Sequence, residues 1–211
     1  KALGEHVTVA LNGTGGDELF AGYGRYFLRP VERRYLAMPA WLRRRLIEPL
    51  MFQISPMNAF RLRRAELYTS DRGAYLHDHT TQFPKPVLDL IGNRQEQAEK
   101  AQRAAYEAFA GEPDTAALYA DLATYLPDDL LTLLDRTSMA VSVEGRVPLL
   151  DHRLVAATLA VPARVRTAGG RQKALQRRIA EDYLPPEVVA APKQGFRSPM
   201  PHWISGAFGT A

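Results

Sequence analysis

Residues 7–23 read VTVALNGTGGDELFAGY, and this stretch decides how the rest of the chain is interpreted. Its first five residues form a short, β-rich apolar run that ends at Asn12, which predicts a buried strand entering a loop. The glycines of that loop let the backbone come close to a ligand and leave N–H groups available to an anion. The acids that follow, Asp17 and Glu18, would repel a bare phosphate and favour one accompanied by Mg²⁺.

The loop fits neither of two common nucleotide-binding motifs. It is not a Walker A loop, because no Gly-Lys-Ser/Thr follows, and its glycine spacing differs from that of the dinucleotide fingerprint. Helix capping is the structural alternative, with Asp17 as the N-cap and Glu18 in the first helical turn. On this stretch alone both interpretations stay open.

The remainder of the chain is expected to be mostly helical, because apolar residues recur at helical spacing between prolines. The segments with this pattern are residues 41–50, 101–109, 130–134, 154–159 and 175–179. The strand near the start is the only clear one, and a single strand cannot form a sheet. Its partner strands are therefore expected from sequence before Lys1 or from another chain.

Composition narrows the class of protein. The 211 residues are 46% hydrophobic, which suits one globular domain with a continuous core. There is no cysteine, which excludes disulfides, thiolate metal sites and a cysteine nucleophile. No apolar stretch approaches the roughly 20 residues of a membrane span, and the start has no signal-peptide pattern. We expect a cytoplasmic protein without membrane contact, and a chain that begins inside a longer one.

The net charge of +4 has a local origin, because arginines cluster between Arg25 and Arg64 with few acids among them. A solvated helical surface is the simpler interpretation, and contact with an anionic partner or a neighbouring domain is the alternative. A nucleic-acid module would interleave aromatic residues or carry a recognisable motif there. None is present, so no nucleic-acid partner is expected.

A second charged stretch lies in residues 135–151, which contain DRTSMA and VEGRVPLLD. Charges embedded in apolar sequence must be paired or solvated, because isolated burial is costly. A structural ion-pair network among Glu144, Arg146 and Asp151 is therefore one interpretation of this stretch.

A third stretch provides two lysines beside glycine turns, Lys173 in GRQKAL and Lys193 in PKQGF. A tight loop can hold the lysine ammonium in place as a point charge that binds a phosphate. A surface lysine without function is the alternative for each.

Together these stretches resemble the synthetase domain of glutamine-dependent asparagine synthetases and of the related β-lactam synthetases. The pattern of that family runs Ser-Gly-Glu-Gly-x-Asp-Glu-Leu-Phe-x-Gly-Tyr, Asp-Arg-x-Ser-Met-Ala, Glu-x-Arg-x-Pro-Phe-Leu-Asp and Pro-x-Lys-x-Gly-Phe. The match extends from Val7 to about Trp203. The resemblance implies an α/β fold of the ATP-pyrophosphatase (adenine nucleotide α-hydrolase-like) type. Residues 1–211 would be the C-terminal portion of that domain, truncated so that they are predominantly α-helical with about one parallel strand.

The resemblance also implies a reaction. ATP activates a carboxylate, aspartate in the family, as an acyl-adenylate with loss of pyrophosphate. Ammonia from glutamine then attacks, which gives asparagine, AMP and glutamate. The N-terminal glutaminase domain and the loop that wraps the ATP phosphates would lie outside residues 1–211, so this fragment alone is expected to be inactive. Homodimerisation stays open.

The same resemblance implies metal-binding, pyrophosphate-binding and nucleotide-binding roles for individual residues. Asp17 would bind Mg²⁺, and Lys173 and Lys193 would hold the leaving pyrophosphate, because charge grows on the departing phosphates. The nucleotide would be contacted by Asn12, Gly13, Gly15 and Arg136.

Thr14 departs from the family pattern, which has an acid at this position. A threonine cannot act as a carboxylate base at neutral pH. Catalysis by Thr14 would therefore differ from that of the family, unless Asp128 or Asp129 supplies the carboxylate. Three hypotheses remain: asparagine formation, an amide or lactam synthetase for another carboxylate, and a catalytically degenerate binding module.

Overall fold

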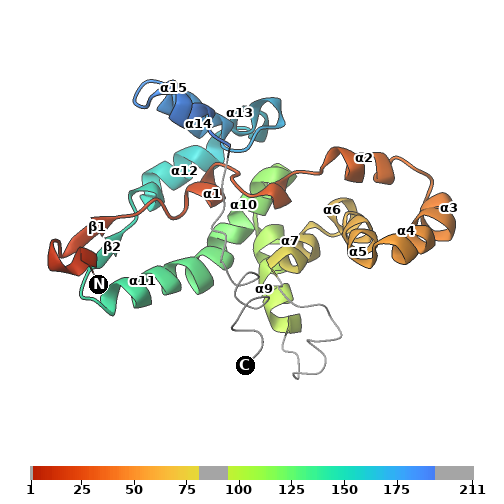
Figure 1. The fold of residues 1–211 in the computed structure, drawn as a ribbon, viewed down its shortest axis with the longest axis horizontal. Coiled ribbons are helices and arrows are strands. Elements are labelled where there is room, and N and C mark those ends of the chain that lie inside the picture. The colour runs from red at the N-terminus through yellow and green to blue at the C-terminus, as the bar shows by residue number, and fades with distance from the viewer. Residues whose placement is uncertain (1, 81–94, 193–211) are drawn as a thin grey trace, which may run out of the picture.

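The computed structural model describes residues 2–80 and 95–192. Within these ranges the chain is mostly helical and contains one small parallel sheet (Figure 1). None of the described helices is long and apolar enough to cross a membrane.

The sheet joins two segments far apart in the sequence. Strand β1 (Val9–Leu11) pairs in parallel with β2 (Glu144–Arg146), with Ala10 opposite Gly145. The expectation that β1 is the only strand and needs a partner from outside the chain is therefore wrong. The sequence of β2 gives little strand signal, because glutamate, glycine and arginine are not β formers. Its pairing depends on tertiary structure.

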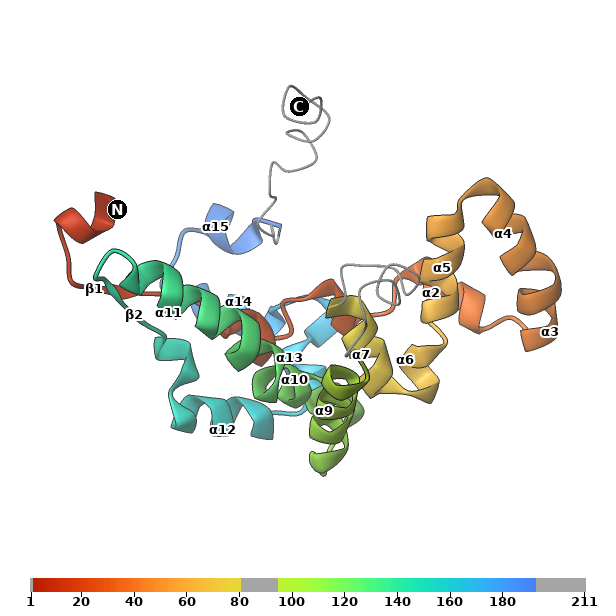
Figure 2. The ribbon, with the colours of Figure 1, turned by 90° about the horizontal axis from the view of Figure 1, so that it is seen from below.

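The prediction that β1 is buried is also wrong for the described part of the chain. Val9 is 37% exposed and Leu11 is 76% exposed, although both are apolar. Gly145 of β2 packs on helix α11 (Thr132–Met139), where a Cβ atom would lie 3.2 Å from the side chain of Leu134. The sheet is thus supported by α11 (Figure 2).

Helical elements fill the sequence before and between the two strands. In chain order they are the 3₁₀ helix η1 (Ala2–Glu5), α1 (Gly16–Leu19), the 3₁₀ helix η2 (Gly24–Tyr26), α2 (Pro30–Leu36), α3 (Ala40–Leu42), the π-helix η3 (Arg43–Ile47), α4 (Glu48–Ile54), α5 (Pro56–Arg64), α6 (Leu67–Ser70), α7 (Arg72–Thr80), α9 (Gln95–Ala108), α10 (Pro113–Ala123), the π-helix η4 (Leu126–Leu131) and α11.

Short helices also follow β2. They are the 3₁₀ helix η5 (Pro148–Leu150), α12 (His152–Ala160), α13 (Ala163–Arg166), the 3₁₀ helix η6 (Ala168–Gly170), α14 (Ala174–Ala180) and α15 (Pro186–Ala190). The apolar periodicity of residues 41–50, 101–109, 130–134, 154–159 and 175–179 is confirmed as helical, apart from Phe109 just beyond the end of α9.

The core gathers around α10, which packs against α9, α7 and α1 (Figures 1 and 2). Small residues on α10 allow this close packing, since Ala117 and Ala120 are fully buried. The buried residues of the cluster are Ala21, Tyr26, Tyr75, Leu76, Ala117, Leu118 and Ala120. Because Ala21 and Tyr26 belong to it, the glycine-rich loop is anchored to the core on its C-terminal side.

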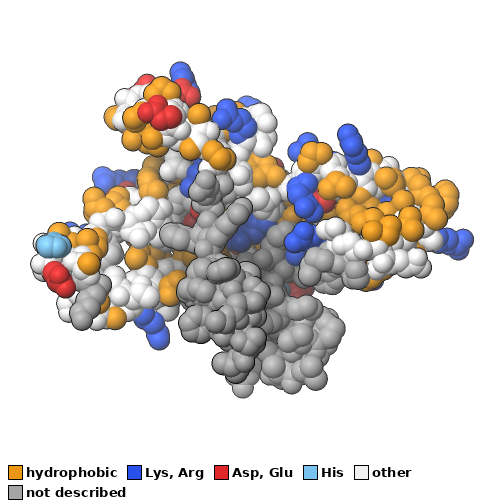
Figure 3. Space-filling model, viewed as in Figure 1, with side chains coloured by type: hydrophobic (Ala, Val, Ile, Leu, Met, Phe, Trp, Pro, Cys, Tyr) orange, Lys and Arg blue, Asp and Glu red, His pale blue; other side chains and the backbone are white. Residues whose placement is uncertain are grey.

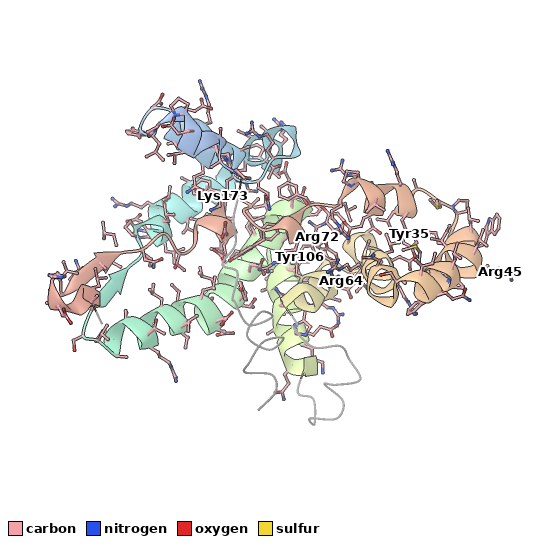
Figure 4. All side chains as sticks on the ribbon, in the orientation of Figure 1. Tyr35, Arg45, Arg64, Arg72, Tyr106 and Lys173 are labelled. Carbon is pink, nitrogen blue, oxygen red and sulfur yellow. The ribbon has the colours of Figure 1, made fainter. Side chains whose placement is uncertain are left out.

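Helices α2–α5, residues 30–64, project to one side as a helical arm (Figures 1 and 2). Apolar side chains lie open on it (Figure 3), among them Trp41, Leu46, Leu50 and Ile54. Arg45 lies at the outer tip (Figure 4) and is exposed, as are Arg33, Arg34, Arg44, Arg61 and Arg63. The exposure of these arginines agrees with a solvated basic surface, and contact with an anionic partner or a neighbouring domain stays the alternative.

Candidate functional site

The loop between β1 and α1 is shaped by its glycines. Gly15 has φ +90°, and a Cβ atom there would lie 2.3 Å from the side chain of Leu150, so only glycine fits. A Cβ atom on Gly13 would meet nothing within 4 Å. The backbone is therefore tight where the loop enters α1 and open at Gly13, beyond the carboxyl end of β1.

Asn12 and Thr14 hold the loop by contacting each other. The Asn12 Oδ1 atom accepts hydrogen bonds from the Thr14 backbone N–H at 2.7 Å and from the Thr14 hydroxyl at 2.5 Å. The Asn12 N–H donates to the carbonyl oxygen of Arg146 at 2.8 Å, which continues the β1–β2 pairing. Because the Thr14 hydroxyl donates its proton to Asn12, the Thr14 Oγ1 atom can only accept further hydrogen bonds.

Asp17 and Lys173 meet, although they come from opposite ends of the chain. Lys173 Nζ lies 2.8 Å from Asp17 Oδ1, and both side chains keep some exposure, at 24% and 20%. Asp17 lies in the first turn of α1 and the N-cap is Gly15, so the alternative in which Asp17 caps the helix is wrong. Figure 4 shows Lys173 between the α13–α15 lobe and the rest of the protein.

Backbone contacts fix Lys173 in this place. Lys173 has φ +56°, and its backbone N–H donates to the carbonyl oxygen of Phe20 at 3.1 Å. The Gln172 side chain donates from Nε2 to the carbonyl oxygen of Gly22 at 2.8 Å. A non-glycine residue held at positive φ is strained, and such strain often accompanies function. Lys173 is therefore held in place by the structure.

Gly22 creates the space for the ion pair. A Cβ atom on Gly22 would lie 1.8 Å from Asp17 Oδ1 and 2.6 Å from Lys173 Cε. The Gly22 N–H also donates to the carbonyl oxygen of Asp17 at 2.7 Å. The roles of Gly22 and Gln172 were not predicted from the sequence. Gly22 lies within residues 7–23, so its place in that motif is the sequence signal that could have indicated its role.

We expect Gly22→Ala to lower the free energy of unfolding by about 1–3 kcal/mol, the usual cost of overpacking, because the new methyl group displaces Asp17 and Lys173. Urea unfolding measures this. Gly13→Ala is the matched control and should stay within about 0.5 kcal/mol of wild type, because its methyl group enters open space. Equal stability of the two variants would contradict the crowding at Gly22.

Glu18 points away from this loop. It is 1% exposed, and its Oε1 accepts a hydrogen bond from the Tyr23 hydroxyl at 2.6 Å. Burial raises the pKa of Glu18, and burial also raises the pKa of Tyr23. Glu18 is thus engaged in the interior, and Asp17 is the acid of this pair that remains partly open to solvent.

A buried network lies beside Tyr23. Asp121, with no exposed surface, accepts from Arg25 Nε at 3.1 Å and Nη2 at 2.9 Å, from Gln102 Nε2 at 2.9 Å and from the Tyr26 hydroxyl. The Arg25 guanidinium also lies 4.2 Å from the centre of the Tyr23 ring. The interpretation of Arg25 as part of a solvated surface is therefore wrong, because its side chain is only 10% exposed.

Three charged residues of the stretch 135–151 belong to two separate ion pairs. Glu144 pairs with Arg146 at 2.9 Å, and Asp151 pairs with Arg153 at 3.1 Å. Asp151 also accepts from the Arg153 N–H at 2.9 Å and caps α12. The expected single network of Glu144, Arg146 and Asp151 is wrong, although each of its members is paired.

The remaining candidate residues form no ion pair with Asp17 or Lys173 within the described ranges, or lie outside those ranges. Arg136 is exposed on α11, and Asp128 and Asp129 are exposed on η4. Lys193 lies outside the described residues. The roles of Arg136 and Lys193 therefore stay predictions.

The donor set limits what kind of metal site is conceivable. Within residues 2–80 and 95–192, no three His, Asp or Glu side chains come together to hold a metal ion. Asp17 is a carboxylate of the kind that contributes to a Mg²⁺ ion held largely by ligand phosphates.

Known proteins are similar in sequence to this chain. The family described as "Asparagine synthase" matches residues 1–210. Asparagine synthetase [glutamine-hydrolyzing] 1 of Bacillus subtilis is 30% identical over 97% of this chain and 33% of its own length. A putative asparagine synthetase of Mycobacterium bovis is 33% identical over 95% of this chain and 31% of its own length. The asparagine synthetase of Gallus gallus is 43% identical over a shorter stretch of 65 residues.

The chain spans about a third of the length of the first two relatives. Its similarity to them covers nearly all of its own residues, including the glycine-rich loop and the segment that carries Lys173. The chain belongs to the asparagine synthase family.

Proposed function

We propose that the whole protein is an ATP-dependent carbon–nitrogen ligase that activates aspartate as an acyl-adenylate, releases pyrophosphate, and amidates the adenylate with glutamine-derived ammonia. The observation that carries the proposal is the contact of Asp17 with Lys173 at 2.8 Å beside the glycine-rich loop. Family membership supports it, because the relatives above are named glutamine-hydrolysing asparagine synthetases.

The position of the pair fits an ATP-pyrophosphatase-type α/β fold. In open α/β sheets, ligands bind outside the carboxyl ends of parallel strands. The loop 12–15 follows the carboxyl end of β1, which is parallel to β2. On this proposal residues 1–211 are the C-terminal portion of the synthetase domain, and the glutaminase domain and the loop around the ATP phosphates belong to the rest of the protein.

The residues present fit Mg²⁺ that arrives with a polyphosphate. Lys173 Nζ already occupies a cation position on Asp17 Oδ1, so this carboxylate is oriented to hold positive charge. Mg²⁺ commonly uses one or two carboxylates and completes its shell with phosphates and water. When bound, Mg²⁺ would neutralise charge on the leaving pyrophosphate.

Lys173 has a matching role in this proposal. Its ammonium is held at the site by Asp17 before any ligand is present, which avoids ordering a long side chain during the reaction. Transfer of this ammonium from Asp17 to a phosphate oxygen would stabilise the leaving group electrostatically. Gly13 leaves the approach to the loop open.

Thr14 favours a second candidate function, an amide or lactam synthetase for another carboxylate. The Thr14 hydroxyl donates to Asn12 Oδ1 at 2.5 Å, so it stabilises the loop and has no carboxylate basicity to offer. Partners on either reading are ATP, a carboxylate and ammonia, in a cytoplasmic protein without a nucleic-acid or membrane partner.

Pyrophosphate release by the whole protein, with ATP·Mg and a panel of carboxylates, tests the proposal. We expect release that depends on aspartate, with asparagine as the product. Release with a different acid alone would support the second candidate. The absence of release with every acid, from protein that still hydrolyses glutamine, would favour a degenerate binding module.

A further inference from the structure

Arg166, the last residue of α13, is a buried cation. It is 1% exposed, and its Nη2 donates to the hydroxyl of Thr115, while Nε and Nη1 have no hydrogen-bond partner among the described residues. Burial lowers the pKa of Arg166, which is the direction expected for a charge removed from water. Such a charge requires a counter-charge.

The two acids whose charges act on Arg166, Glu112 and Asp114, are engaged elsewhere. Glu112 Oε2 accepts a hydrogen bond from the Ala163 N–H at 2.7 Å, and Asp114 Oδ1 lies 3.2 Å from Arg72 Nη2. Both acids act on Arg166 only from a distance. Within residues 2–80 and 95–192, no carboxylate therefore forms an ion pair with Arg166.

Arg166 lines a cavity of about 360 Å³ between η2, α2, α10 and α13. Arg33 and Arg164 also line it, and Asp114 is the only acid among its described lining residues. The remaining wall is largely apolar or aromatic and includes Phe27. Ligand sites are typically apolar cavities of about 300–1,000 Å³ with a few polar anchoring groups, which matches this arrangement.

A second cavity of about 570 Å³ adjoins the first and shares Phe27 and Arg33 with it. Its described lining residues include Arg29, Arg171 and Arg177 and no acid. Arginines therefore line both cavities. Such a concentration of positive charge attracts a ligand with more than one negative charge.

We propose that the cavity lined by Arg166 binds a small phosphorylated organic molecule. Its phosphate would lie against the guanidinium groups of Arg33 and Arg164, beside the buried charge of Arg166, and its organic part against the apolar wall. A dianionic phosphate fits better than a single carboxylate, because three arginines face one acid that Arg72 already engages.

This site is distinct from the Asp17–Lys173 pair and does not rest on the proposed function. The two are nonetheless neighbours in the chain, because Ala21, Gly169 and Gly170 line the cavity and lead into the segments that meet at the pair. An occupant of the cavity would therefore touch the segment that leads into Lys173.

Binding of phenyl phosphate to the whole protein, followed by calorimetry, tests the proposal, with benzyl alcohol as the neutral probe. We expect phenyl phosphate to bind and Arg166→Met to weaken it at least tenfold. The control Arg178→Met, at an exposed arginine paired with Glu181, should leave the affinity unchanged. Without ligand, Arg166→Met should raise Tm by a few degrees, because it removes an uncompensated buried charge.

The variant Arg33→Met tests the same cavity if Arg166→Met folds poorly. Arg33 is exposed, and within the described residues its side chain donates only to the Leu28 carbonyl oxygen, so this variant should fold and bind at least threefold more weakly. No binding by wild type up to about 10 mM, about −2.7 kcal/mol, would overturn the proposal. So would affinities of both variants within twofold of wild type, or loss of binding in Lys173→Met alone.

Discussion

Lys173→Met in the whole protein is expected to slow carboxylate-dependent pyrophosphate release at least about a hundredfold, the effect of losing one electrostatic stabiliser in a preorganised site. The reason is geometric as well as electrostatic. Lys173 is held by its backbone contact to Phe20 and by its ion pair with Asp17, so no other side chain of the described loop carries a cation to the same place. A steady-state pyrophosphate assay measures the loss.

Lys100→Met is the control for this variant, because Lys100 is exposed on α9 in another part of the protein. It should retain wild-type rates, and glutamine hydrolysis should be unaffected in both variants. If Lys173→Met released pyrophosphate at a rate close to that of wild type, Lys173 would be a structural partner of Asp17 and nothing more.

Asp121→Ala should lower the free energy of unfolding by about 3–5 kcal/mol, the range for breaking a buried ion pair from one side. The substitution leaves Arg25 buried without its carboxylate and removes the acceptor of the Gln102 and Tyr26 side chains. Since these residues lie beside the core that anchors the loop, the loss should appear as a lower urea midpoint for the whole transition.

The exposed pair of Glu144 and Arg146 provides the comparison for Asp121. Their side chains are 56% and 60% exposed, so Glu144→Ala should leave the urea midpoint close to that of wild type, because solvent screens an exposed ion pair. Comparable losses for Asp121→Ala and Glu144→Ala would show that burial does not decide the strength of these two ion pairs.

The sequence indicates which charged residues gather at the site better than it indicates the contacts around them. Asp17 and Lys173 are identifiable because charged residues beside glycine turns form recognisable motifs, and the structure brings the two together. No sequence pattern indicates that Gln172 donates to the Gly22 carbonyl, because such a contact depends on how two distant loops approach.

The predictions for β2 and Arg25 are wrong for the same physical reason, because tertiary packing decides the structure at both places. β2 is missed because Glu144 and Arg146 have no strand preference, and its hydrogen bonds to β1 override local propensity. Arg25 looks like a surface cation in a basic stretch, yet Asp121 compensates its charge in the interior. Helices are predicted well because their apolar spacing is local, as for α12 and α14.

If Lys173 leaves Asp17 to hold pyrophosphate, as we propose, bound pyrophosphate should change the rate at which a lysine-acylating reagent modifies Lys173 in the whole protein. Mass spectrometry of the modified peptides reports this rate with and without saturating Mg·pyrophosphate. We expect pyrophosphate to slow modification of Lys173 at least several-fold and to leave the exposed Lys100 unchanged. Equal reactivity of Lys173 with and without bound pyrophosphate would contradict this role of Lys173.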